Sequence, residues 1–149
     1  MPSQKKNRVL LINPTSLEIY QNAKVKVAAP EYPPLNLVTL AASLKNANID
    51  VRIIDLQTVS NPKNILKRII ENFNPNTIGM TFTTPLVHSM RTISRFIKKY
   101  DKNILLLGGG SHASAEPTTT LKDSLLDVII FGEGDFTILD VISNKNTLS

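Results

Sequence analysis

The sequence predicts an α/β domain with a Rossmann-like (flavodoxin-like) three-layer fold, in which helices cover both faces of one parallel sheet. Short apolar runs alternate with segments of helical periodicity along the chain, as in proteins built from strand–helix–strand units. The runs are nearly continuous in Val, Ile and Leu, which is typical of strands buried on both faces. A length of 149 residues suits one core, so we expect a single domain over residues 1–149.

The expected strands are five short runs, which we place at residues 8–12, 50–54, 77–81, 103–107 and 127–131. Because crossovers between parallel strands are right-handed, few topologies are open to such a chain. A five-stranded parallel sheet in the order 2-1-3-4-5 fits best, since this order is a common solution for doubly wound sheets.

The segments between these strands carry apolar residues three and four positions apart, which predicts helices that bury one face. Asn61 and Thr84 each precede a proline, so we expect both to cap helices whose first residue is that proline. The expected helices begin after Pro34, at Pro62, at Pro85, near Pro117 and near Glu133 or Asp135.

Residues 13–32 do not fit a minimal domain of this class. They form a connection of about twenty residues, far longer than the usual loop between a strand and a helix. The segment follows the first strand, at the edge of the sheet where ligands bind in such folds. Two interpretations stay open: a lid or binding loop, or an insertion that packs on itself or on a partner domain. Residues 1–7 and 143–149 are expected to be loose ends.

Composition narrows the function classes. The chain has no cysteine, which excludes disulfides, zinc–thiolate sites and iron–sulfur clusters held by this chain. The net charge is +5, but the basic residues are scattered and aromatic residues do not interleave with them, so nucleic acid is not an expected partner. The apolar runs are too short to span a membrane and no signal peptide is recognisable, so we expect a cytoplasmic protein without membrane contact.

Two glycine-rich segments follow the last two predicted strands. Gly108-Gly109-Gly110 comes directly after the fourth apolar run, and Gly132-Glu133-Gly134 comes after the fifth. Both segments lie at carboxyl ends of parallel strands, where ligands bind in open sheets. The absence of bulky side chains there lets a large flat ligand approach the backbone.

The other polar residues at strand ends give weaker signals. Thr81 and Thr83 end the third strand and are candidate ligand contacts, whereas Thr84 is expected to cap the next helix. Asp55 ends the second strand; a turn-forming role is favoured over a ribose contact. His112 follows the first glycine segment, and the sequence leaves open whether it contacts a ligand or only the loop.

Familiar nucleotide motifs are missing. Asn13-Pro14-Thr15 stands where a dinucleotide fingerprint would need its glycines, and no P-loop occurs. A phosphoacceptor receiver domain needs acidic residues at the ends of its first strands, and Asn13 replaces one of them. His88 is expected to be an ordinary residue in the first turns of a helix, and Glu133 suits the positive end of a helix dipole.

Several segments together resemble the cobalamin (B12)-binding N-terminal domain of B12-dependent radical S-adenosylmethionine enzymes. The stretch Tyr-Pro-Pro-Leu-Asn-Leu and the Leu-Ala-Ala-Ser-Leu that follows are similar to that family's signature. Further landmarks follow in the family's order and at matching strand ends. The resemblance covers about residues 8–142 and is carried by residues 32–45, 51–55, 78–83, 108–112 and 131–134.

The resemblance implies a bound cobalamin with its corrin over the strand ends. The nucleotide tail would be displaced from cobalt and would enter the domain beside the fourth and fifth strands. No residue of this chain is expected to act as a catalytic group or to bind a metal. The resemblance implies cofactor contacts from Thr81, Thr83, Gly108 and Gly109. With the neighbouring residues of the two glycine segments, the expected contacts also include Gly110, His112, Gly132, Glu133 and Gly134.

Two departures from related proteins shape the expected function. The methionine-synthase and mutase branch of cobalamin domains carries D-x-H-x-x-G after the first strand, and its histidine binds cobalt. Residues 13–17 lack that histidine, so no protein imidazole is expected on cobalt. Without a CxxxCxxC motif, the chain cannot hold the 4Fe-4S cluster that cleaves S-adenosylmethionine. We therefore expect a cobalamin-binding module that serves a radical S-adenosylmethionine methyltransferase or a related enzyme, with the catalytic barrel, cluster and S-adenosylmethionine in a partner or missing domain.

Two alternatives stay open. The chain could be a degenerate domain of this fold that binds no cofactor and acts as an interaction module. It could also be a small nucleotide-binding or flavin-binding protein, because the fold alone fixes no chemistry.

Overall fold

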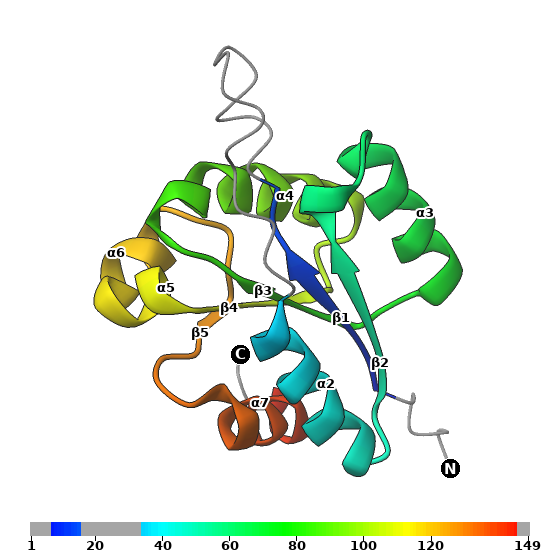
Figure 1. Cartoon of the computed structure of the whole chain (residues 1–149), viewed down its shortest axis with the longest axis vertical. Helices are drawn as coiled ribbons and strands as arrows, with labels where there is room; N and C mark the ends of the chain where they lie inside the picture. Colours follow the sequence, from blue (N-terminus) through cyan, green and yellow to red (C-terminus); the bar gives the residue numbers. More distant parts are fainter. Residues whose placement is uncertain (1–6, 16–33, 146–149) are drawn as a thin grey trace.

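The computed structural model describes residues 7–15 and 34–145, which form a parallel five-stranded sheet between two layers of helices (Figure 1). The strand order is β2-β1-β3-β4-β5, which confirms the predicted fold class and topology. The strands are β1 (Arg8–Asn13), β2 (Asp50–Asp55), β3 (Thr77–Thr81), β4 (Leu105–Gly109) and β5 (Val128–Ile129). The α-helices are α2 (Leu35–Asn46), α3 (Pro62–Phe73), α4 (Val87–Tyr100), α5 (Ser111–Ala115), α6 (Pro117–Lys122) and α7 (Gly134–Ser143), and the 3₁₀ turns are η1 (Leu56–Thr58) and η2 (Thr84–Leu86).

β1 is a central strand of the sheet and is buried on both of its faces. It pairs with β2 from Arg8 to Asn13 and with β3 from Val9 onward, and residues 9–12 are at most 1% exposed. This burial explains why the sequence of the strand is continuously apolar. Because all pairs are parallel, the carboxyl ends of the strands meet at one edge of the sheet.

The pleat of the strands divides the interior into two apolar clusters. Leu10, Ile78 and Leu106 point to the face that α3 and α4 cover. Leu11 and Leu107 point to the other face, which α2 and α7 cover (Figure 1). The alternation along each strand therefore decides which helical layer a given side chain contacts.

The predicted cap of α3 is confirmed, and the predicted cap of the next helix is wrong. Asn61 Oδ1 accepts a hydrogen bond of 3.3 Å from the Asn64 N–H, with Pro62 as the first helical residue. Thr84 instead opens the 3₁₀ turn η2, and its Oγ1 lies 3.1 Å from His112 Nδ1. The hydroxyl is engaged by a ring from a neighbouring segment, so α4 begins later, at Val87.

The fourth and fifth strands differ from their predicted bounds. β4 begins at Leu105 because Asp101 Oδ1 accepts a hydrogen bond from the Asn103 N–H and holds that segment in a turn. Gly108 and Gly109 are consequently the last residues of a strand rather than part of a turn. β5 is reduced to two residues, and α5, which precedes the predicted helix at Pro117, was not predicted.

The two described ends of the domain lie in contact. α7 ends at Ser143, and Lys145 Nζ then donates a hydrogen bond to Asn7 Oδ1. Most of the long connection predicted at residues 13–32 lies outside the described residues, as do residues 1–6 and 146–149. Within the described parts of the chain, no helix is long and apolar enough to cross a membrane.

A polar cluster anchors the amino ends of β4 and β5. Lys98 Nζ donates to Ile104 O at 2.8 Å, to Lys102 O at 3.3 Å and to Asp127 Oδ2 at 2.6 Å. The same Asp127 oxygen accepts a 2.7 Å hydrogen bond from the Leu106 N–H. One carboxylate therefore joins the end of α4 to the start of two strands.

Replacing that carboxylate is expected to destabilise the domain. Asp127→Ala removes the acceptor of both Lys98 and the Leu106 N–H and should lower the free energy of unfolding by about 1–3 kcal/mol. The control is Glu71→Ala, which breaks only an exposed pair with Lys67 and should cost about 0.2–0.5 kcal/mol. Urea denaturation measures both losses, and equal losses would contradict the anchoring role.

Candidate functional site

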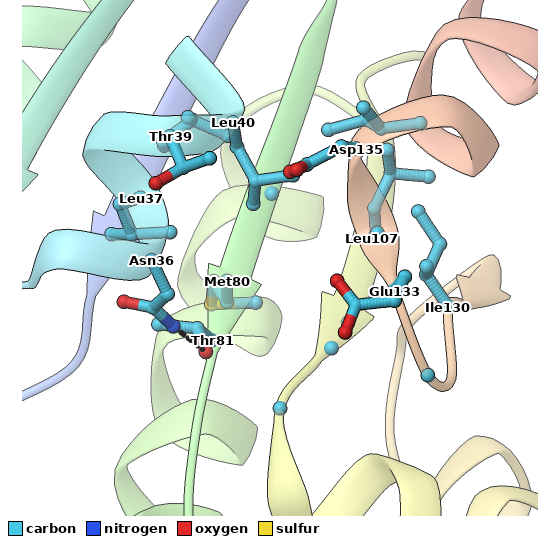
Figure 2. A pocket seen from close by; sticks show the side chains of 18 residues that line it. Asn36, Leu37, Thr39, Leu40, Met80, Thr81, Leu107, Ile130, Glu133 and Asp135 are labelled. Carbon is cyan, nitrogen blue, oxygen red and sulfur yellow. Dashed lines mark hydrogen bonds between the residues drawn. The ribbon is translucent and has the colours of Figure 1, made fainter. Parts of the chain in front are cut away.

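A cavity of about 280 Å³ lies between the sheet and the helices α2 and α7, toward the carboxyl ends of the strands (Figure 2). It is on the face of the sheet that Leu11 and Leu107 share with these helices. Its lining comes from β1, β3, β4, α2, α7 and the segment between β5 and α7. Such a concave site at this edge of a parallel sheet is where ligands bind in doubly wound folds.

Two glycines on neighbouring strands create the hollow. In the register of β3 and β4, Gly79 lies beside Leu107 and Thr81 lies beside Gly109, and all four residues line the cavity. A Cβ atom added to Gly79 would lie 3.0 Å from Leu11 Cδ2, and one added to Gly109 would lie 3.4 Å from Ile130 O. Side chains at these positions would therefore occupy the space that the cavity now leaves open.

Gly108 has a different role from its neighbour. A Cβ atom at this position would lie 2.5 Å from Leu126 Cδ1, 3.0 Å from Ile129 Cδ1 and 3.2 Å from Phe82 Cε1. These side chains belong to the α3 and α4 face of the sheet or pack against it. Gly108 is thus required for packing in the core, even though its backbone also lines the cavity.

Gly110 turns the chain away from β4. Its φ of +104° lies in the region that disfavours residues with a Cβ atom, and an added Cβ would be only 2.7 Å from Phe82 O. Of the three consecutive glycines, Gly109 is therefore the one at which a side chain would enter the cavity without disturbing the fold.

Polar groups gather at the mouth of the cavity. Asn36 Nδ2, in the first turn of α2, donates a 2.9 Å hydrogen bond to Thr81 Oγ1, so the Thr81 hydroxyl hydrogen can be donated elsewhere (Figure 2). The start of α7 contributes two carboxylates, Glu133 at its N-cap and Asp135 in its first turn. In residues 7–15 and 34–145, no group of three His, Cys, Asp or Glu side chains is placed to hold a metal ion.

The floor of the cavity is apolar. Asn36, Thr39 and Glu133 are exposed, whereas the aliphatic lining residues are largely buried. Those with at most 8% of their surface exposed are Leu11, Leu37, Leu107, Ile130 and Ile138. The arrangement suits a flat apolar group that enters between the helices and keeps its polar end at the mouth.

The structure brings most of the sequence-predicted site residues to this cavity. Thr83 and His112 are the two that do not line it. Thr83 is exposed and lines a more open hollow of about 410 Å³ next to the cavity, and the two share Asn36, Thr81 and Gly110. His112 contacts Thr84 and packs beside Phe82, with ring centroids 6.1 Å apart. The predicted residues that do line the cavity are Thr81, Gly108, Gly109, Gly110, Gly132, Glu133 and Gly134.

The sequence analysis missed the apolar lining of the cavity and, among its glycine and polar residues, Gly79, Asn36, Thr39 and Asp135. A signal for Gly79 was present, because a glycine inside an apolar strand often marks a close approach of another group. Asn36 lies within the Tyr-Pro-Pro-Leu-Asn-Leu stretch that carries the resemblance, but its contact with Thr81, 45 residues away in the chain, has no local signal.

The end of β1 is held by a side-chain hydrogen bond. Asn13 is 7% exposed, and its Nδ2 donates a 3.0 Å hydrogen bond to Asp55 Oδ1. The same carboxylate oxygen accepts a 3.0 Å hydrogen bond from the Gln57 N–H, which confirms the turn-forming role expected for Asp55. His88, the other histidine, lies in the first turn of α4, as expected.

Substitution of the two adjacent glycines should separate packing from cavity lining. Gly108→Ala forces a methyl group against three core side chains and should lower the free energy of unfolding by about 1–3 kcal/mol. Gly109→Ala meets only ordinary van der Waals contacts, so its effect should stay within about 0.5 kcal/mol. Urea unfolding of both variants measures the two losses. A larger loss of unfolding free energy for the Gly109 variant than for the Gly108 variant would refute the conclusion that Gly108 faces the packed core and Gly109 faces the cavity.

Solved structures with the same arrangement include proteins of several functions. A cobalamin-binding protein from Desulfitobacterium hafniense has a TM-score of 0.64 at 10% identity, with 97% of this chain and 60% of that chain covered. The receiver domain of the response regulator RcsB from Escherichia coli has a TM-score of 0.63 at 10% identity, with coverages of 95% and 94%. The cobalamin-dependent S-adenosylmethionine radical enzyme OxsB has a TM-score of 0.62 at 18% identity, with coverages of 97% and 19%. At these identities the likeness establishes the fold alone.

Sequence comparison identifies the family. An uncharacterized methyltransferase of Pyrococcus horikoshii is 27% identical over 136 residues, which are 91% of this chain and 28% of that protein. This chain thus spans less than a third of the length of that relative. The family model for the B12 binding domain matches residues 22–142, and the chain therefore belongs to the B12-binding domain family.

Proposed function

We propose that this domain binds cobalamin in the base-off form, with the nucleotide tail in the cavity and the corrin over the carboxyl ends of the strands. The observation that carries the proposal is the hollow at Gly79 and Gly109, which side chains would otherwise fill. It lies in a member of the B12-binding domain family, and its apolar floor suits an aromatic base.

The polar mouth suits the charged and hydroxyl groups of a nucleotide. Thr81 and Asn36 would donate hydrogen bonds to the phosphodiester, which carries a negative charge. Glu133 and Asp135 would accept hydrogen bonds from hydroxyl groups, and their own charges disfavour the phosphodiester on the α7 side. The tail would therefore enter with its phosphate toward β3 and α2.

We further propose that no protein imidazole binds cobalt. The buried Asn13 ends β1, and its amide is engaged by Asp55. Neither His88 nor His112 lines the cavity or the open hollow beside it. The space beneath the corrin would instead be bounded by the polar strand ends.

The catalytic work would belong to other parts of a larger enzyme. When bound, cobalamin supplies a carrier for a methyl group, while this chain binds the cofactor, orients it and excludes water from its tail. We propose that the domain serves a radical S-adenosylmethionine methyltransferase or a related enzyme. This assignment is supported by the similarity of the chain to a methyltransferase of Pyrococcus horikoshii and to the cobalamin-dependent S-adenosylmethionine radical enzyme OxsB. S-adenosylmethionine and a 4Fe-4S cluster would bind outside this sequence, which has no cysteine.

A second candidate is an interaction domain without a cofactor. Phe131 and Phe136, near the cavity, are 67% and 81% exposed, and a partner protein could cover them as well as a corrin could. The likeness to receiver domains shows that this fold also occurs in signalling proteins.

Anaerobic titration with hydroxocobalamin and methylcobalamin, followed by gel filtration and a visible spectrum, separates the two candidates. Co-elution of protein and cofactor with a base-off spectrum is the expected result. Folded protein that elutes without cofactor would reject the proposal in favour of the interaction domain.

A substitution at Gly109 should remove binding and leave the fold intact. Gly109→Val places a branched side chain in the cavity, so we expect cobalamin affinity to fall at least tenfold while thermal unfolding stays cooperative. The control is Ala42→Val on the exposed face of α2, which introduces the same branched side chain away from the cavity and should bind normally. Unchanged uptake by the Gly109 variant would refute the placement of the tail.

A further inference from the structure

Among the residues that the structure describes, the floor of the cavity offers no side chain with a strong hydrogen-bonding group. The polar lining residues Asn36, Thr39 and Glu133 are exposed at the mouth, and the hydroxyl of Thr39 already donates to Leu35 O at 3.2 Å. Thr81, at the end of β3, and Asp135, at the start of α7, are half-buried. Among the described lining residues, every side chain that is buried is aliphatic or is the thioether of Met80.

The backbone of β3 and β4 around the floor is also engaged, whereas Ile130 O, which lies 3.4 Å from a Cβ atom built on Gly109, is an acceptor within reach of the cavity. Gly79 and Leu107 lie within the ladder between β3 and β4, where their polar groups pair with neighbouring strands. At the end of β4, Gly108 O accepts a 2.8 Å hydrogen bond from the Ile130 N–H, and Gly109 O accepts one of 3.0 Å from the Phe82 N–H. A polar atom placed on the floor would therefore find few partners.

We infer that the cavity selects cobamides by the lower base of their nucleotide tail, taking benzimidazole-type bases and rejecting adenine. This inference rests on the proposed function. A dimethylbenzimidazole presents a hydrocarbon edge to the floor, whereas adenine presents an exocyclic amine and ring nitrogens. Polar groups that lose water without gaining a hydrogen bond weaken binding, while a methyl-bearing edge gains contacts with the aliphatic floor.

Competition between three cofactors tests the selection. The probes are cobalamin, the cobamide that carries adenine in place of dimethylbenzimidazole, and cobinamide, which lacks the nucleotide. We expect the dissociation constant of the adenine cobamide to exceed that of cobalamin at least tenfold, as for a buried unsatisfied polar group. Adenine is the weaker base and leaves cobalt more readily, so weaker binding would not stem from the displacement step.

The possible outcomes separate this inference from the proposed function. Adenine cobamide binding as tightly as cobalamin would overturn base selection and leave cobalamin binding in place. Cobinamide binding as tightly as cobalamin would overturn the use of the cavity by the tail. If cobalamin itself does not bind to folded protein, the proposed function fails, and base selection fails with it.

A change in the cavity wall supplies an independent measurement. Leu40 on α2 is half-buried, and its side chain lines the cavity (Figure 2). Leu40→Gln introduces an amide that can pair with adenine, so the ratio of the two dissociation constants should fall several-fold. Leu40→Met keeps the wall apolar at similar volume and should retain the wild-type ratio. An equal ratio in both variants would count against an apolar wall as the source of selection.

Discussion

The alternation of side chains along two neighbouring strands governs the rest of the site. In β3 and β4 successive residues face opposite helical layers. Gly79 and Gly109 leave space on the face that α2 and α7 cover, whereas Gly108 allows close packing on the face that α3 and α4 cover. A shift of one residue in the pairing would turn each side chain to the opposite face of the sheet. The hollow would then lie on the face that α3 and α4 cover. The cavity thus depends on strand register as much as on glycine content.

Much of the architecture was accessible from the sequence. Continuous apolar runs identified the buried strands. Right-handed crossovers left few strand orders open, and the one that is common in doubly wound sheets is the order that the structure has. Local signals worked where the partner is also local, as at Asn61, whose cap bond spans three residues. They failed at Thr84, because its hydroxyl is engaged by His112 from a segment 28 residues away.

The site was predictable in location but not in detail. The sequence places two glycine segments at the correct edge of the sheet, yet it cannot assign Gly108 and Gly109 to opposite faces, because that depends on where β4 begins and ends. The contribution of α2 was missed for a related reason. Asn36 reaches the site through the packing of its helix, which a linear pattern does not encode.

The steric openness at Gly109 has an evolutionary consequence. A glycine codon becomes an alanine or valine codon through one nucleotide change, and a Cβ atom at this position meets only an ordinary van der Waals contact. A lineage could therefore lose its ligand in a single step and keep a folded domain, free to acquire other roles. The same architecture occurs in a cobalamin-binding protein and in a receiver domain, so the fold itself does not fix which ligand is bound.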